Sequence, residues 1–69
     1  MQLTAERRRR GWSQAELARR AGLNPTTVGL IESGRLRPYP VQLQKLSRAL
    51  AWPEADAEQL LERATQDHE

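Results

Sequence analysis

The stretch of sequence that decides the fold is SQAELARRAGLNPTTVGLIESG, residues 13–34 of a chain of 69. Its first half has a clear helix start and stop. Ser13 and Glu16 fit a capping box, in which Ser13 accepts a hydrogen bond from the Glu16 amide and Glu16 reaches back. Gly22 then ends the segment, because glycine adopts a left-handed turn without a steric penalty. These signals predict a short helix before Gly22.

The second half begins a new helix almost at once. Asn24 is a strong N-cap, Pro25 suits the first helical position, and Gly34 supplies the stop. Two helices joined by so short a turn cannot lie antiparallel, so they must cross steeply. Residues 13–34 therefore predict a helix-turn-helix.

Glycine and proline residues divide the rest of the chain into three more helix-sized pieces, at about 2–10, 40–51 and 54–65. No strand-like alternation is present. The sequence predicts an all-α domain of five helices over residues 1–65, followed by a frayed tail at 66–69. Sixty-nine residues suffice for one domain with a thin core.

Charge is distributed unevenly along the chain. Residues 1–50 hold ten basic side chains and three acidic ones, a net charge of +7, whereas residues 51–69 hold one basic and six acidic, a net charge of −5. A basic segment of this density indicates a polyanionic partner, because lysine and arginine release counterions from phosphates. The alternative is a well-solvated helical surface.

Composition also bears on what the chain does not do. It has no cysteine and one histidine, so we expect no disulfide, no metal site and no cofactor. No set of residues suggests an enzyme. No apolar run approaches membrane-spanning length, and the first residues lack the apolar stretch of a secretory signal. We therefore expect a cytoplasmic protein.

At this point residues 13–34 resemble the helix-turn-helix of the Cro/C1-type (XRE-like) phage repressors. The motif residues that carry the likeness stand in register: Ser13-Gln14, Leu17-Ala18, Gly22, Ile31-Glu32 and Gly34. The likeness covers about residues 3–51. It implies a five-helix bundle of the lambda-repressor-like DNA-binding type.

The resemblance implies roles for four residues outside the recognition helix. Ser13 and Gln14 match positions at the start of the first motif helix that contact DNA phosphate, which suits the free amides of a helix N-terminus. Arg7 and Glu32 match positions that form a structural ion pair in several repressors. Breaking one partner of such a pair can cost roughly 3–5 kcal/mol.

Base reading is expected from the start and outer face of the third helix, at Pro25, Thr26, Thr27 and Leu30. Members of the family often carry glutamine, arginine, serine or lysine here, some of which pair bidentately with base edges. This chain instead offers two threonines and an apolar leucine. The departure favours readout of low specificity, or readout of DNA shape.

The loop after the third helix supplies Arg35, Arg37 and Tyr39 as candidates for phosphate or minor-groove contacts. The alternative is a proline-locked loop with solvated arginines.

The resemblance also implies a homodimer at least on DNA, because members of the family often dimerise through the fourth and fifth helices and so place two recognition helices in successive major grooves. The candidate dimer surface consists of Leu50, Trp52, Leu60 and Leu61. The alternative is that Trp52 and the leucines close the core of the single chain.

The resulting hypothesis is a DNA-binding transcriptional regulator, a repressor, that inserts the helix Pro25–Ser33 into the major groove of double-stranded DNA. The runner-up is a protein-interaction module with weak or no sequence-specific DNA binding, which binds a toxin, polymerase or another regulator through the Val28–Leu30 face and the fifth helix. Added salt should weaken DNA binding steeply and an apolar interface little.

Overall fold

The computed structural model describes residues 1–63, and its central feature is the pair of helices α2 (Gln14–Ala21) and α3 (Pro25–Glu32). Ser13 caps α2, since its hydroxyl oxygen accepts from the Glu16 backbone N–H at 3.0 Å. Gly22 ends the helix with a φ of 72°. The other half of the expected capping box does not form, because the Glu16 carboxylate instead accepts hydrogen bonds from Arg19 and Arg20.

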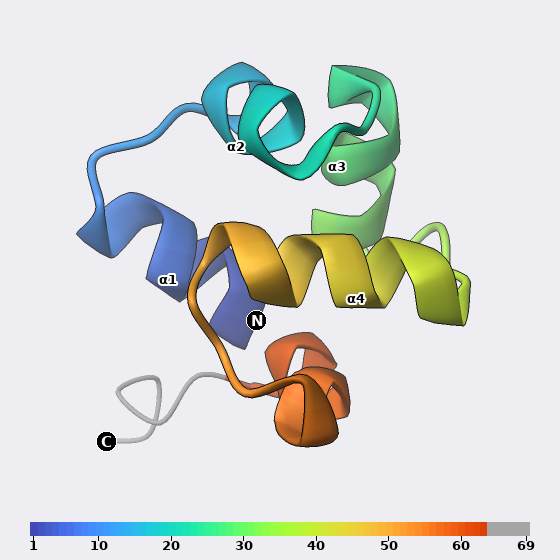
Figure 1. The fold of residues 1–69 in the computed structure, drawn as a ribbon. Helices are drawn as coiled ribbons and strands as arrows, with labels where there is room; N and C mark the ends of the chain where they lie inside the picture. The colour runs from blue at the N-terminus through green and yellow to red at the C-terminus, as the bar shows by residue number, and fades with distance from the viewer. Residues whose placement is uncertain (64–69) are drawn as a thin grey trace.

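The start of α3 follows its local sequence. The Asn24 side chain accepts from the Thr26 backbone N–H at 2.8 Å, and Pro25 is the first helical residue. Ser33 is the C-cap and Gly34 turns the chain away with a φ of 79°. Helices α2 and α3 cross steeply, as Figure 1 shows, so the predicted helix-turn-helix geometry is present.

Three further helices complete the described part of the chain: α1 (Gln2–Arg9), α4 (Pro40–Ala49) and η1 (Glu54–Leu61). The prediction of an all-α domain of five helices is confirmed for residues 1–63, which contain no strand. Helix α4 ends before Ala51, because that residue turns the chain with a left-handed φ of 53°.

The helix predicted at about 54–65 differs from the one observed, because η1 is a 3₁₀ helix and not a regular α-helix. Its backbone is kinked at Asp56, and hydrogen bonds of the tighter 3₁₀ type run from Asp56 N–H to the Pro53 carbonyl and from Glu62 N–H to the Gln59 carbonyl. The predicted end of this helix at Thr65 and the predicted frayed tail at 66–69 lie outside the described residues.

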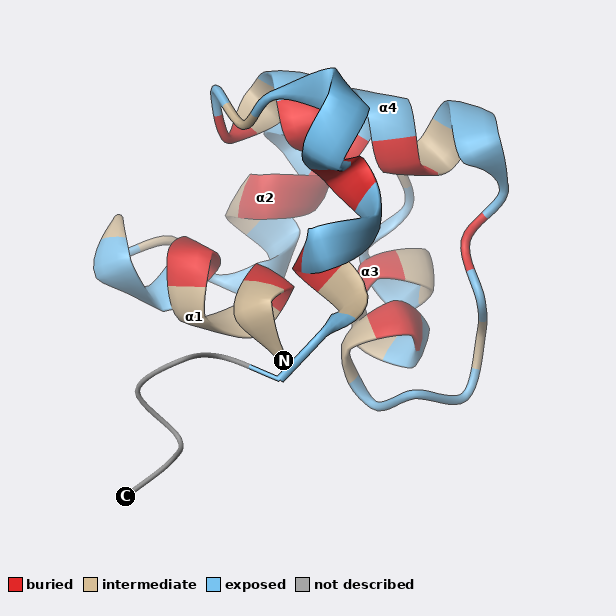
Figure 2. Ribbon diagram, turned by 90° about the horizontal axis from the view of Figure 1, so that it is seen from below, coloured by how far each residue is buried: buried red, intermediate tan, exposed pale blue. Residues whose placement is uncertain are grey.

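The core forms where all five helices turn their apolar sides inward, and the buried positions in Figure 2 lie on the sides of the helices that face one another. Leu50 and Leu60 belong to this core, with exposed fractions of 1% and 0%. These two side chains are therefore enclosed within the single chain and do not lie on a surface. The expectation that they belong to a dimer surface does not hold for the fold described here.

The two ends of the domain are joined by hydrogen bonds between distant parts of the chain. The Gln2 N–H donates to the Glu62 carbonyl at 2.6 Å, and Arg10 Nη2 donates to the Leu50 carbonyl at 2.6 Å. Helix α1 is thereby held against the end of α4 and against η1. This arrangement leaves the outer side of α3 uncovered.

Candidate nucleic-acid interface

A shallow hollow lies on the outer face of α3 and extends to the start of α2 and the loop that follows α3. Its lining residues are Gln14, Pro25, Thr26, Gly29, Leu30, Ser33 and Arg35. Within α3 the positions 26, 29, 30 and 33 are three and four residues apart, so they share one helical face. The hollow brings together several residues that the sequence nominated for DNA contacts, from three separate segments.

Beneath this surface Arg7 and Glu32 form a bidentate ion pair that joins α1 to the end of α3. Arg7 Nε donates to Glu32 Oε2 at 2.8 Å and Arg7 Nη2 donates to Oε1 at 3.0 Å. The side chains are only 10% and 5% exposed. Arg7 Nη1 also donates to the Trp12 carbonyl at 2.8 Å, so the guanidinium fixes the α1–α2 turn as well.

Two opposing effects set the pKa of Glu32. Burial raises it, but hydrogen bonds from Arg7 and Gln14 and the positive charge of Arg7 outweigh burial, so the pKa lies below its usual value of 4.5. Glu32 is therefore a carboxylate at neutral pH and can hold both partners.

Gln14 connects the ion pair to the surface. Its Nε2 donates to Glu32 Oε1 at 3.0 Å, which places the glutamine across the side of α3 at Gly29. A Cβ added to Gly29 would stand 3.4 Å from Gln14 Oε1, an ordinary van der Waals contact. The small residue in mid-helix thus lies beneath the glutamine that joins α2 to α3.

The three loop residues predicted to contact DNA do not lie on one surface. Arg35 is exposed and lines the hollow, whereas Arg37 and Tyr39 do not line it. Arg37 Nη2 instead donates to Glu58 Oε1 on η1 at 2.7 Å. Tyr39 is 69% exposed at the position that caps α4. Among these residues, Arg35 alone shares a surface with the outer face of α3.

The remaining nominated residues occupy less open positions. Thr27 is half-buried on the inner side of α3. The Ser13 hydroxyl oxygen already accepts from a helix amide. Trp52 and Leu61, the other candidates for a dimer surface, are half-buried against the core, and Trp52 Nε1 donates to the Asp56 carbonyl at 3.0 Å.

Sequence reasoning did not include Gly29 and Ser33 among the contact residues, although both line the hollow. Their spacing from Thr26 was the available signal, since residues three, four and seven positions apart share a helical face.

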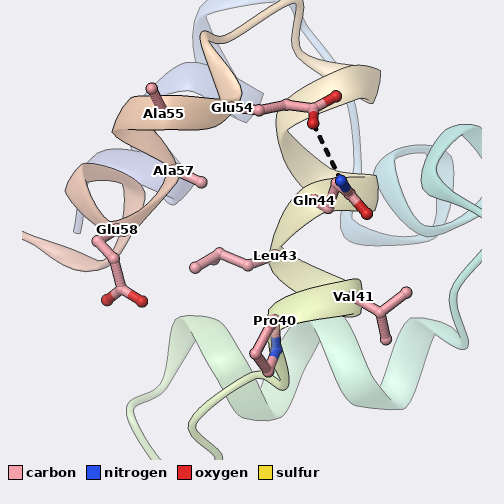
Figure 3. A pocket seen from close by; sticks show the side chains of 8 residues that line it. All are labelled: Pro40, Val41, Leu43, Gln44, Glu54, Ala55, Ala57 and Glu58. Carbon is pink, nitrogen blue, oxygen red and sulfur yellow. Dashed lines mark hydrogen bonds between the residues drawn. The ribbon is translucent and has the colours of Figure 1, made fainter.

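A second hollow, of about 490 Å³, lies between α4 and η1 (Figure 3). Leu43 and Ala57 line it, and Glu54 and Glu58 also face it. Gln44 Nε2 donates to Glu54 Oε1 across its edge at 3.0 Å. Two carboxylates make this hollow unsuited to a phosphate backbone, which leaves the α3 surface as the candidate interface.

A sequence model described as "Helix-turn-helix domain" matches residues 1–60. The chain belongs to the helix-turn-helix domain family. The matched residues include both motif helices and all the residues that line the hollow on α3. This family lies in the broader XRE/Cro-like group, and membership indicates a DNA-binding regulator. Searches of curated proteins and of solved structures gave no match to this helix-turn-helix domain.

Within residues 1–63 of this helix-turn-helix domain, the helices are too short and too polar for any of them to cross a membrane. The same residues bring together no group of three acidic or histidine side chains able to hold a metal ion.

Proposed function

We propose that this domain is a transcriptional regulator that represses by placing α3 in the major groove of double-stranded DNA. The observation that carries the proposal is the hollow on the outer face of α3, where Thr26 and Leu30 line the same surface as Gln14 and Arg35. A B-DNA major groove, about 12 Å wide, admits one α-helix. A domain that occupies the groove blocks other proteins, which makes repression the expected result.

Charge and backbone geometry support phosphate contacts from two residues next to α3, Gln14 and Arg35. Gln14 lies at the start of α2, where unpaired helix amides and the helix dipole favour an anion. Arg35 is exposed, and no ion pair engages it among the described residues. These two residues are the proposed phosphate contacts, and Thr26 and Leu30 in the same hollow are the proposed base contacts.

A dimer on DNA fits the dimensions of the domain. Recognition helices of paired domains lie about 34 Å apart along one face of the duplex. The described chain measures 33 × 24 × 23 Å, so two copies can stand side by side on successive grooves. Because Leu50 and Leu60 are buried, the surface between copies would use Trp52 and Leu61 from the original set.

The first experiment is a titration of random-sequence and genomic duplex pools at two salt concentrations, with sequencing of the bound fraction. We expect enrichment of a two-fold symmetric motif and a fall of about 0.9 in log K per unit of log salt for each phosphate neutralised. Weak binding without selection at both salt concentrations would overturn the proposal.

Variants then separate the two kinds of contact. Gln14→Ala and Arg35→Ala should weaken binding to all sequences, whereas Thr26→Ala should change the preferred base at one position. Arg37→Ala is the matched control for Arg35→Ala, because Arg37 is paired with Glu58 away from the hollow. If neither Thr26→Ala nor Leu30→Ala changed affinity or preference, α3 would not be the reading helix.

A second function, docking of a protein partner on the α3 face, is favoured by one observation. Leu30 is one of the exposed large hydrophobic residues, at 36%. Binding through such a surface would change little with salt, in contrast to DNA binding. In that case Leu30→Ala would abolish capture of the partner, and Arg35→Ala would have little effect.

A further inference from the structure

The outer face of α3 carries no long polar side chain, which is unusual for a helix that reads DNA bases. Its members at the hollow are Pro25, Thr26, Gly29, Leu30 and Ser33. None of these carries the amide or guanidinium that pairs bidentately with adenine or guanine. Hydrogen-bonded base recognition from this face is therefore limited to hydroxyl groups.

The polar groups nearest to this face are already partly engaged. Ser33 Oγ donates to the Leu30 carbonyl at 3.0 Å, within the helix. Gln14 Nε2 donates to Glu32 Oε1 at 3.0 Å. The second Nε2–H of Gln14, the hydroxyl of Thr26 and the guanidinium of Arg35 remain for polar contacts.

Leu30 then supplies the largest apolar group on the face. Three large hydrophobic residues are exposed within residues 1–63, namely Leu30, Tyr39 and Val41. The other two lie at the start of α4 and do not line the α3 hollow. The apolar surface that α3 presents is thus centred on one side chain, with Thr26 one helical turn before it.

The only apolar feature of an unmodified base edge in the major groove is the C5-methyl group of thymine. We propose that Leu30, with Thr26 beside it, recognises pyrimidine C5-methyl groups and is the main specificity-determining residue of this domain. The chemistry is shared by thymine and 5-methylcytosine, which carry the methyl group at the same ring position. This inference rests on the proposed entry of α3 into the major groove.

The test uses the sequence most enriched from a random duplex pool. That duplex is made in three forms: with thymine, with deoxyuridine in place of thymine, and with 5-methylcytosine in place of cytosine. Dissociation constants are measured for each by fluorescence anisotropy at fixed salt. Loss of each contacted methyl group should weaken binding about fourfold.

Variants of Leu30 test whether this side chain causes the dependence of binding on the methyl group. Leu30→Ala should bring the ratio of the deoxyuridine and thymine dissociation constants close to one, while Val41→Ala, a truncation outside the hollow, should leave the ratio as in the parent chain. Leu30→Gln should also lower the ratio and shift preference toward adenine, because an amide pairs with adenine N6 and N7.

Three results would count against the proposal. Equal binding of the thymine and deoxyuridine duplexes would overturn methyl recognition and leave the DNA-binding function intact. A ratio unchanged by Leu30→Ala would show that another residue reads the methyl group. Absence of salt-dependent binding to the whole pool would overturn the proposed function and this inference with it. Tighter binding of the 5-methylcytosine form would extend the same chemistry to a modified base.

Discussion

Ala51 adopts a backbone conformation that suits glycine, since its φ is 53°. The left-handed region costs a residue with a Cβ roughly 1–2 kcal/mol, and part of this is offset because glycine is more flexible in the unfolded chain. Ala51→Gly should therefore raise the free energy of unfolding by about 0.5–1 kcal/mol. Urea denaturation measures the change. Ala15→Gly, in the helical part of α2, is the control and should lower stability by a similar amount.

Ser47 is fully buried in α4, and its hydroxyl has no hydrogen-bond partner within residues 1–63. A buried polar group without a partner loses its hydration and gains nothing in return. Ser47→Ala should raise the free energy of unfolding by about 1 kcal/mol. Ser13→Ala should lower it by about 1 kcal/mol, because that hydroxyl caps α2. Thermal unfolding of both variants checks the pair, and a loss of stability in Ser47→Ala would show that this hydroxyl is satisfied.

At the scale of the element, α3 carries a glycine in its middle that weakens the helix. A Cβ at Gly29 would make ordinary contact with Gln14 Oε1, at 3.4 Å, and the glycine has no positive φ. Gly29→Ala should therefore stabilise the domain by about 0.5–1 kcal/mol through helix propensity. The measurement is the midpoint of chemical denaturation.

The matched control is Gly22→Ala at the end of α2, where the φ of 72° makes a Cβ unfavourable. This change should lower the midpoint. A lower midpoint for Gly29→Ala as well would mean that the contact of the new methyl group with Gln14 Oε1 costs more than the gain in helix propensity.

For the whole molecule, the two buried carboxylates make stability depend on pH. Burial raises the pKa of Glu6, but hydrogen bonds from Arg10 and Arg9 outweigh it, so the pKa of Glu6, like that of Glu32, lies below 4.5. A carboxyl with a lowered folded-state pKa stabilises the fold fully above its unfolded-state pKa, and the contribution is lost as the pH falls through the folded-state pKa. Stability should therefore decline as the pH drops below about 4.5.

Glu32→Gln tests the contribution of the Arg7–Glu32 pair. It should destabilise the domain by about 3 kcal/mol at neutral pH, because it leaves Arg7 buried without its counter-charge. It should also flatten the acid decline, since glutamine does not titrate. Urea unfolding of parent and variant from neutral pH to below 4.5 measures both effects, and an equally steep decline in the variant would assign the titration to other groups.

Local sequence signals determined the helix-turn-helix. Ser13, Gly22, Asn24 and Gly34 act within one turn of the chain, through a single hydrogen bond or an allowed φ, so their effect does not depend on the rest of the fold. The prediction of Thr26 and Leu30 as base contacts rests instead on the resemblance of residues 13–34 to the Cro/C1-type repressors.

Tertiary structure decided which long side chains pair and which leucines are enclosed. Gln14 and Arg7 reach Glu32 from 18 and 25 residues away, and Arg37 turns to Glu58 on η1 and not to the α3 face. Leu50 and Leu60 could have served a core or a dimer surface by sequence, and only the packing of η1 against α4 and α1 encloses them. The sequence around an arginine or a leucine does not determine its partner, because its contacts depend on the positions of helices that are distant along the chain.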